Sequence, residues 1–224
     1  MNLVNHNSLG ATLDAVTEAF FLDRKLSPAQ RTRVAKWIAS RQGLPGSYAN
    51  MFAPTARDFR TGYRVFTGEK VTSRAATAHI LGEEACRALS LLDVLVAEAR
   101  VARRRAAEGM QARLGRSNSG TYCCGTCSVS LWRNLAAGGL PNAKRRLLAG
   151  LNALRRNRLG NGRWRRFPFF YTLLALEELG LPAALAELRY AAPACERCLK
   201  RTANGSPFTN RRRLLLQRVL EKCG

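Results

Sequence analysis

Long apolar segments are missing from the sequence, and acidic residues and histidines are scarce. No apolar segment approaches the roughly 18 residues that a membrane-spanning helix needs. The N-terminus is polar, with Asn2, Asn5 and Asn7 ahead of an amphipathic pattern. We therefore expect neither a membrane span nor a signal peptide. Tracts of proline, serine and glutamine are also missing, and 46% of the 224 residues are hydrophobic. This composition excludes wholesale disorder and predicts a globular protein with a real core.

The shortage of acidic residues leaves a large positive charge. The chain has 15 Asp and Glu against 37 Lys and Arg, a formal net charge of +22. A small domain usually has a net charge of about 2 to 8 in magnitude. Residues 1–112 contain 16 basic and 10 acidic side chains, a net +6, whereas residues 113–224 contain 21 and 5, a net +16. We therefore expect a polyanionic partner for the C-terminal half.

Helix signals dominate the sequence and period-two alternation is absent, which predicts an all-α protein of antiparallel helical hairpins. The segment from Ser117 to Gly120 is the clearest linker. It predicts an N-terminal helical lobe over residues 1–116 and a basic C-terminal helical lobe over 117–224. One long helix is expected from Gly82 to about Leu114. Pro193 is expected to kink or split the helix predicted over 182–200, because proline removes a backbone hydrogen bond.

Residues 121–180 contain a helix, a turn and a second helix with recurring glycine and aromatic positions. The pattern comprises Gly150-Leu151, Leu154, Asn161-Gly162-Arg163-Trp164 and Tyr171 to Leu176. It resembles the helix, Gly-Xaa-Trp turn, helix unit of the terpenoid cyclase and protein prenyltransferase superfamily, whose hairpins stack into an α/α toroid. The resemblance implies part of such a toroid and an enzyme that acts on an isoprenoid or another diphosphate. The Asp-Xaa-Asp-Asp motif that would protonate an isoprenoid is missing, and the acidic pairs Glu83-Glu84 and Glu177-Glu178 are isolated.

Two Cys-Xaa-Xaa-Cys pairs, Cys124/Cys127 and Cys195/Cys198, are the candidate metal ligands. This spacing lets two thiolates bind one metal ion at about 2.3 Å from each sulfur. The first pair lies at a predicted helix N-terminus, where the helix dipole favours thiolates. The two pairs together predict a tetrahedral site for zinc or a [4Fe-4S] cluster.

The other cysteines leave alternatives open. Cys86 and Cys123 are further candidate ligands, and small buried cysteines that pack helix interfaces are the alternative to any metal site. Seven cysteines without a secretory signal indicate a reducing compartment, so we expect a cytoplasmic protein.

Basic side chains of the C-terminal half are the candidate phosphate ligands: Arg155, Arg156, Arg158, Arg163, Arg165, Arg166, Arg211, Arg212 and Arg213. Trp164 and Phe167 alternate with some of these arginines, a mixture that can bind phosphates while a base stacks on an aromatic ring. Trp164 is therefore the candidate stacking residue. In the alternative interpretation, Trp164 and Phe167 belong to the core and the arginines form a solvated rim.

Three functions from different classes remain. No Walker loop, dinucleotide-binding glycine motif or Ser-His-Asp set is present, so no catalytic residue is assigned. A metal-stabilised basic protein that binds nucleic acid or another polyanion accounts for both the charge and the cysteine pairs. The alternatives are an enzyme that acts on an isoprenoid or other diphosphate and a protein-interaction scaffold.

Overall fold

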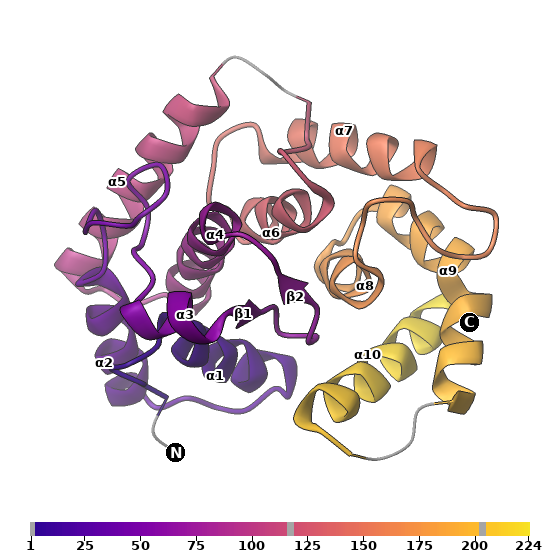
Figure 1. Cartoon of the computed structure of the whole chain (residues 1–224), viewed down its shortest axis with the longest axis horizontal. Helices are drawn as coiled ribbons and strands as arrows, with labels where there is room; N and C mark the ends of the chain where they lie inside the picture. The colour runs from indigo at the N-terminus through magenta and orange to yellow at the C-terminus, as the bar shows by residue number, and fades with distance from the viewer. Residues whose placement is uncertain (1–2, 116–118, 202–204) are drawn as a thin grey trace. The chain divides into compact units, whose positions relative to one another are not determined.

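A computed structural model describes residues 3–115, 119–201 and 205–224, and these residues form ten helices and one small sheet (Figure 1). The predicted all-α fold is confirmed. The helices are α1 (Leu9–Phe21), α2 (Pro28–Ala39), α3 (Ala56–Thr61), α4 (Arg74–Leu92), α5 (Ala97–Leu114), α6 (Gly125–Ala136), α7 (Ala143–Arg156), α8 (Phe169–Glu178), α9 (Pro182–Arg201) and α10 (Pro207–Cys223), and the paired strands are β1 (Tyr63–Arg64) and β2 (Lys70–Val71). None of the helices in the described ranges is both long and apolar enough to cross a bilayer.

The chain divides into two compact units that each combine distant segments. Unit 1 comprises Met1–Tyr63, Lys70–Ser117 and Arg133–Ala143, and unit 2 comprises Arg64–Glu69, Asn118–Trp132 and Lys144–Gly224. The predicted lobes differ from these units in two places, because 64–69 belongs to unit 2 and 133–143 belongs to unit 1. Residues 117 and 118 of the expected linker lie outside the described residues.

Helix α4 is the centre of unit 1 and contacts α1, α2, α3 and α5. Every residue from Thr77 to Leu89 is buried, including two adjacent carboxylates, Glu83 and Glu84. A buried charge needs a partner, and the end of α6 provides it. Arg133 forms an ion pair with Glu84, and the Asn134 amide donates a hydrogen bond to Glu83.

The single helix predicted from Gly82 to Leu114 is interrupted. Helix α4 ends at Leu92, and Asp93 takes a left-handed conformation with φ +44°. Aspartate tolerates this conformation better than most residues because its short side chain can form local hydrogen bonds. The chain then turns, and α5 begins at Ala97 and packs against α4 and α2.

Unit 2 is built around α8, which is buried from Tyr171 to Leu176 and contacts α9 and α10. The turn between α7 and α8 uses positive φ angles at Gly160 and Gly162, and Arg158 and Trp164 pair across it as an antiparallel bridge. Helix α9 continues through Pro193, so the predicted split is wrong, and the predicted kink stays a prediction. Buried residues on both sides of this proline hold the helix in the core, while the proline itself is exposed.

Candidate functional site

Three cysteines lie together at the start of α6. The Sγ atoms of Cys123, Cys124 and Cys127 all lie within 4.8 Å of one another. Cys123 and Cys124 are exposed, whereas Cys127 is buried. The backbone N–H of Cys127 donates a hydrogen bond to the Cys124 sulfur (3.3 Å), and the Ser128 hydroxyl donates to the Cys124 carbonyl (2.7 Å). The Cys124 sulfur thus accepts a hydrogen bond from a backbone N–H in the first turn of α6, as the hydroxyl of an N-cap serine would. We call these three residues the tri-cysteine cluster.

Two thiols of the cluster differ in their affinity for a proton. The pKa of Cys124 is lowered to about 5, chiefly because the Cys127 thiol donates a hydrogen bond to its thiolate, and the Cys127 backbone N–H adds to the effect. The pKa of Cys127 is raised, because it provides that hydrogen bond and is buried. At neutral pH the pair therefore holds one thiolate and one thiol. Metal binding would release the remaining proton, because thiolates are the metal ligands.

The backbone around Arg166 lies very close to Gly125, next to the tri-cysteine cluster. A side chain at Gly125 would overlap the carbonyl oxygen of Arg166, so only glycine fits there. Arg166 itself has φ +69°. The chain around Arg166 thus lies directly against the start of α6. A small pocket of about 180 Å³ remains beside the cysteines, with Tyr122 and Phe167 among its walls. The cluster is consequently open to solvent on one side.

The second cysteine pair does not join the cluster. Within the described ranges, Cys123, Cys124 and Cys127 form the one group of three or more potential metal ligands at this spacing. Cys195 is buried on α9, which packs against α8 and α10, and burial raises its pKa to about 12. The Cys198 sulfur accepts a hydrogen bond from Arg163 (3.3 Å). The predicted four-cysteine centre is therefore not formed, because α9 directs its cysteines to other neighbours.

Trp164 is a core residue, which contradicts its predicted stacking role. Its side chain is only 4% exposed, and its indole N–H donates to a carboxylate oxygen of Glu187 (2.9 Å). Its ring lies near the rings of Phe169 and Tyr190, with centroids 6.2 and 5.9 Å away. A nucleic-acid base can stack only on an accessible ring face. The structure thus favours the alternative in which this tryptophan belongs to the core.

Four of the nine predicted phosphate ligands have partners within the fold: Arg158, Arg163, Arg211 and Arg212. Arg211, for example, donates a hydrogen bond to the Phe66 carbonyl (3.2 Å). Its guanidinium also lies 4.2 Å from the centre of the Phe66 ring. The other five are exposed: Arg155, Arg156, Arg165, Arg166 and Arg213. The role of these five as phosphate ligands stays a prediction.

One carboxylate of each acidic pair that a diphosphate enzyme would use for magnesium is engaged by a basic residue. Glu84 pairs with Arg133 inside unit 1, and Glu177 pairs with Lys222 (2.9 Å) inside unit 2. Magnesium binds carboxylates that are free to coordinate it. This arrangement weighs against the enzyme alternative.

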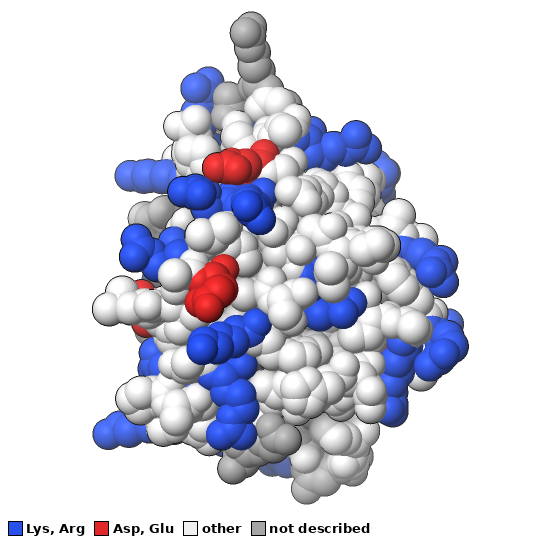
Figure 2. All heavy atoms as spheres, turned by 90° about the vertical axis from the view of Figure 1, so that its left-hand side faces the viewer, with Lys and Arg blue, Asp and Glu red and all other residues white. Residues whose placement is uncertain are grey.

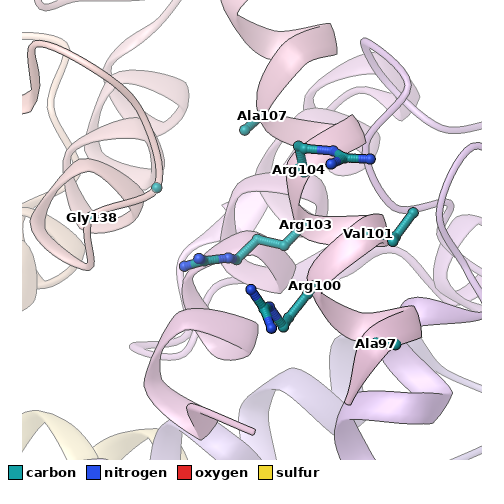
Figure 3. A pocket seen from close by; sticks show the side chains of 8 residues that line it. Ala97, Arg100, Val101, Arg103, Arg104, Ala107 and Gly138 are labelled. Atoms are coloured by element: carbon teal, nitrogen blue, oxygen red, sulfur yellow. The ribbon is translucent and has the colours of Figure 1, made fainter. Parts of the chain in front are cut away.

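Sequence reasoning missed one basic site, an open pocket of about 550 Å³ in unit 1 (Figure 3). Its walls are Ala97, Arg100, Val101, Arg103, Arg104, Ala107, Gly138 and Gly139. In the sequence, the most obvious basic feature of this region is the uninterrupted Arg103–Arg105 segment. The informative signal was the spacing of Arg100 and Arg103, which places both on neighbouring turns of one helix face. Gly138 and Gly139 lie in the turn that follows α6, and no local pattern predicts that this turn lies near α5.

The surface retains the charge excess of the sequence. Figure 2 shows one face, on which Lys and Arg side chains are spread widely and Asp and Glu side chains are few. Comparisons with protein-family models, curated proteins and solved structures find no match for this chain. The resemblance of residues 121–180 to the terpenoid cyclase and prenyltransferase superfamily stays a prediction. The case for a function therefore depends on the geometry and charge described above.

Proposed function

We propose that the chain is a metal-stabilised basic helical protein that binds nucleic acid or another polyanion. One observation supports it most: the exposed cations of the C-terminal half have few acidic neighbours. Of its five acidic residues, Glu187 is buried against Arg158, and Glu177 is paired with Lys222. Among the described residues of this half, the exposed cations are Arg113, Lys144, Arg145, Arg155, Arg156, Arg163, Arg165, Arg166, Arg189, Arg197, Lys200, Arg201, Arg213 and Lys222. Such a surface attracts a phosphate backbone by counterion release.

In this proposal the protein contacts the phosphates of a nucleic acid and not its bases. Because Trp164 is buried, it offers no ring on which a base could stack. Phosphate contacts position a protein on nucleic acid but do not distinguish sequences. We therefore expect similar affinities for unrelated sequences and a steep dependence on salt.

The tri-cysteine cluster supports the metal part of the proposal. Three sulfurs within 4.8 Å need only small movements to reach the geometry of three thiolates about 2.3 Å from one zinc ion. A [4Fe-4S] cluster usually has four cysteine ligands, so three favour zinc over iron–sulfur. Water or a ligand from outside the chain would complete the zinc coordination. The ion would hold 123–124 against the first turn of α6.

The test is fluorescence anisotropy with a labelled duplex and a labelled single strand at roughly 50 to 200 mM salt. Over this range, affinity that depends on phosphate contacts falls steeply as salt rises. Arg155→Gln/Arg156→Gln removes two exposed cations from the end of α7. It should make the slope of log affinity against log salt shallower by about 2, because each lost phosphate contact removes about 0.9 for duplex DNA.

Arg33→Gln/Lys36→Gln is the matched control, because both side chains are exposed on α2 in unit 1 and the loss of charge is the same. The control should leave the slope close to that of the wild type. Equal slopes in all three proteins would contradict the proposal. So would release of nucleic acid at physiological salt by a protein that retains an isoprenoid diphosphate, which would favour the enzyme.

A further inference from the structure

The arginine-lined pocket of unit 1, which we call the α5 pocket, is not used by the proposed function. Arg100 and Arg103 lie one turn apart on α5. Figure 3 shows both side chains extending toward the side on which Gly138 lies, whereas Arg104 and Val101 extend the other way. Two guanidinium groups thus face the same space from neighbouring turns.

Neither guanidinium is neutralised by the fold. Within the residues that the structure describes, no ion pair involves Arg100 or Arg103, whereas Arg104 pairs with Glu108 (3.8 Å). Asp93 lines the adjoining hollow with both arginines but forms no ion pair with them. The Arg103 guanidinium donates to the Ser90 hydroxyl (3.0 Å), which fixes its position and leaves most of its donors free. The α5 pocket therefore presents two positive charges, one of them held in place.

The opposite wall consists of two glycines that leave room for a ligand. A Cβ at Gly138 would meet no atom within 4 Å, so this wall is open. A side chain at Gly139 would overlap Asn134, so glycine is required there. The N–H groups of Gly138 and Gly139 bond the carbonyls of Leu135 (3.1 Å) and Asn134 (3.0 Å). The glycine wall therefore leaves room for a ligand, and the arginine guanidinium groups provide the hydrogen-bond donors.

We propose that the α5 pocket binds a phosphorylated small molecule with its phosphate or diphosphate between Arg100 and Arg103. Arginine binds phosphate through two parallel hydrogen bonds, and two arginines on one face can hold adjacent phosphates. A volume of about 550 Å³ suits a compact ligand of nucleotide size. Ala97 and Ala107 provide apolar surface for the rest of the molecule. A nucleic-acid strand has the same phosphate chemistry, so the experiment must separate the two sources.

Isothermal titration calorimetry of the full chain with pyrophosphate, at about 150 mM salt to weaken non-specific contacts, provides the test. Arg100→Gln and Arg103→Gln should each raise Kd about tenfold or more, since each removes a charge-assisted contact. Arg100→Lys should weaken binding as well, because lysine keeps the charge but loses the planar pair of donors. Arg105→Gln is the matched control, exposed on the same helix but outside the pocket walls, and should bind as the wild type does.

Several outcomes would overturn the proposal. They are no binding of pyrophosphate by the wild type, an equal loss in Arg105→Gln, or an effect of Arg100→Gln on an oligonucleotide but not on pyrophosphate. Arg100→Gln is the decisive variant because no described contact of the fold depends on its guanidinium, and circular dichroism would verify the fold of each variant. The pocket and the polyanion surface can fail separately. Pyrophosphate binding with no response to Arg155→Gln/Arg156→Gln in the nucleic-acid assay would reject the proposed function and retain the pocket.

Discussion

Glu187 connects α9 to the turn between α7 and α8, and its removal should destabilise unit 2. Its side chain is 3% exposed and accepts a hydrogen bond from the Trp164 indole (2.9 Å). It also accepts two from the Arg158 guanidinium, at 3.1 and 2.8 Å. Glu187→Ala leaves the indole N–H without its acceptor in the core and separates Arg158 from its counter-charge.

The expected loss follows from these contacts. Breaking a buried ion pair by removing one partner typically costs about 3 to 5 kcal/mol. The Arg158 side chain is 30% exposed, so water partly solvates its charge and lowers the cost. We therefore expect Glu187→Ala to lower the free energy of unfolding by about 2 to 4 kcal/mol. Glu187→Gln should cost less, about 1 to 2 kcal/mol, because the amide oxygen can still accept from Trp164.

Urea unfolding followed by tryptophan fluorescence measures the change, since Trp164 itself reports on this region. Glu196→Gln is the matched control, because Glu196 is exposed on the same helix, and it should change stability by less than about 0.5 kcal/mol. A double-mutant cycle with Trp164→Phe, followed by circular dichroism because this variant lacks the fluorescent reporter, should give a coupling energy of about 1 kcal/mol with Glu187→Ala. Equal stabilities of Glu187→Ala and Glu196→Gln would refute the structural role assigned to this carboxylate.

Two further predictions concern the cysteines. Zinc, measured by mass spectrometry of purified protein, should fall together with the melting temperature in Cys127→Ser but not in Cys223→Ser; unchanged zinc in Cys127→Ser would reject the tri-cysteine site. In metal-free protein, Cys124 should react with iodoacetamide at pH 6 to 7, because its pKa of about 5 makes it a thiolate there, whereas Cys195, with a pKa raised to about 12, should stay protonated and unreactive. Peptide mapping checks the order of labelling, and faster labelling of Cys195 would contradict it.

Local sequence signals mark the starts of two helices. Ser8 caps α1 by accepting from the Ala11 N–H, and Ser27 with Pro28 begins α2. Such starts can be read from the sequence because an N-cap side chain and the backbone N–H that donates to it lie within one turn. The same holds for Cys124 and Cys127, which meet because Cys124 directly precedes α6 and Cys127 lies three positions further on, in its first turn.

Contacts between distant segments could not be predicted in the same way. In the sequence Glu83 and Glu84 are an isolated acidic pair, but in the fold they are buried and contact Arg133 and Asn134 from the end of α6. The role of Trp164 was ambiguous because the alternation of cations and aromatics suits both a binding surface and a core rim. Only Glu187, on a different helix, decides between the two. Tertiary partners, which local periodicity does not reveal, therefore determined these sites.

The chain contains far more arginine than lysine, and the contacts of the arginines within the fold change what this excess indicates about function. Several arginines use the flat guanidinium twice, as a donor to a backbone carbonyl and as a cation over a ring. Arg212 donates to the Thr67 carbonyl (2.6 Å) and lies 4.5 Å from the centre of the Phe170 ring. Lysine cannot combine the two contacts so well, because its charge is a compact point with no planar face. Arginine content therefore does not by itself indicate a phosphate ligand. More informative are arginines without such partners in the described structure, which are Arg155 and Arg156 for the polyanion surface and Arg100 for the α5 pocket.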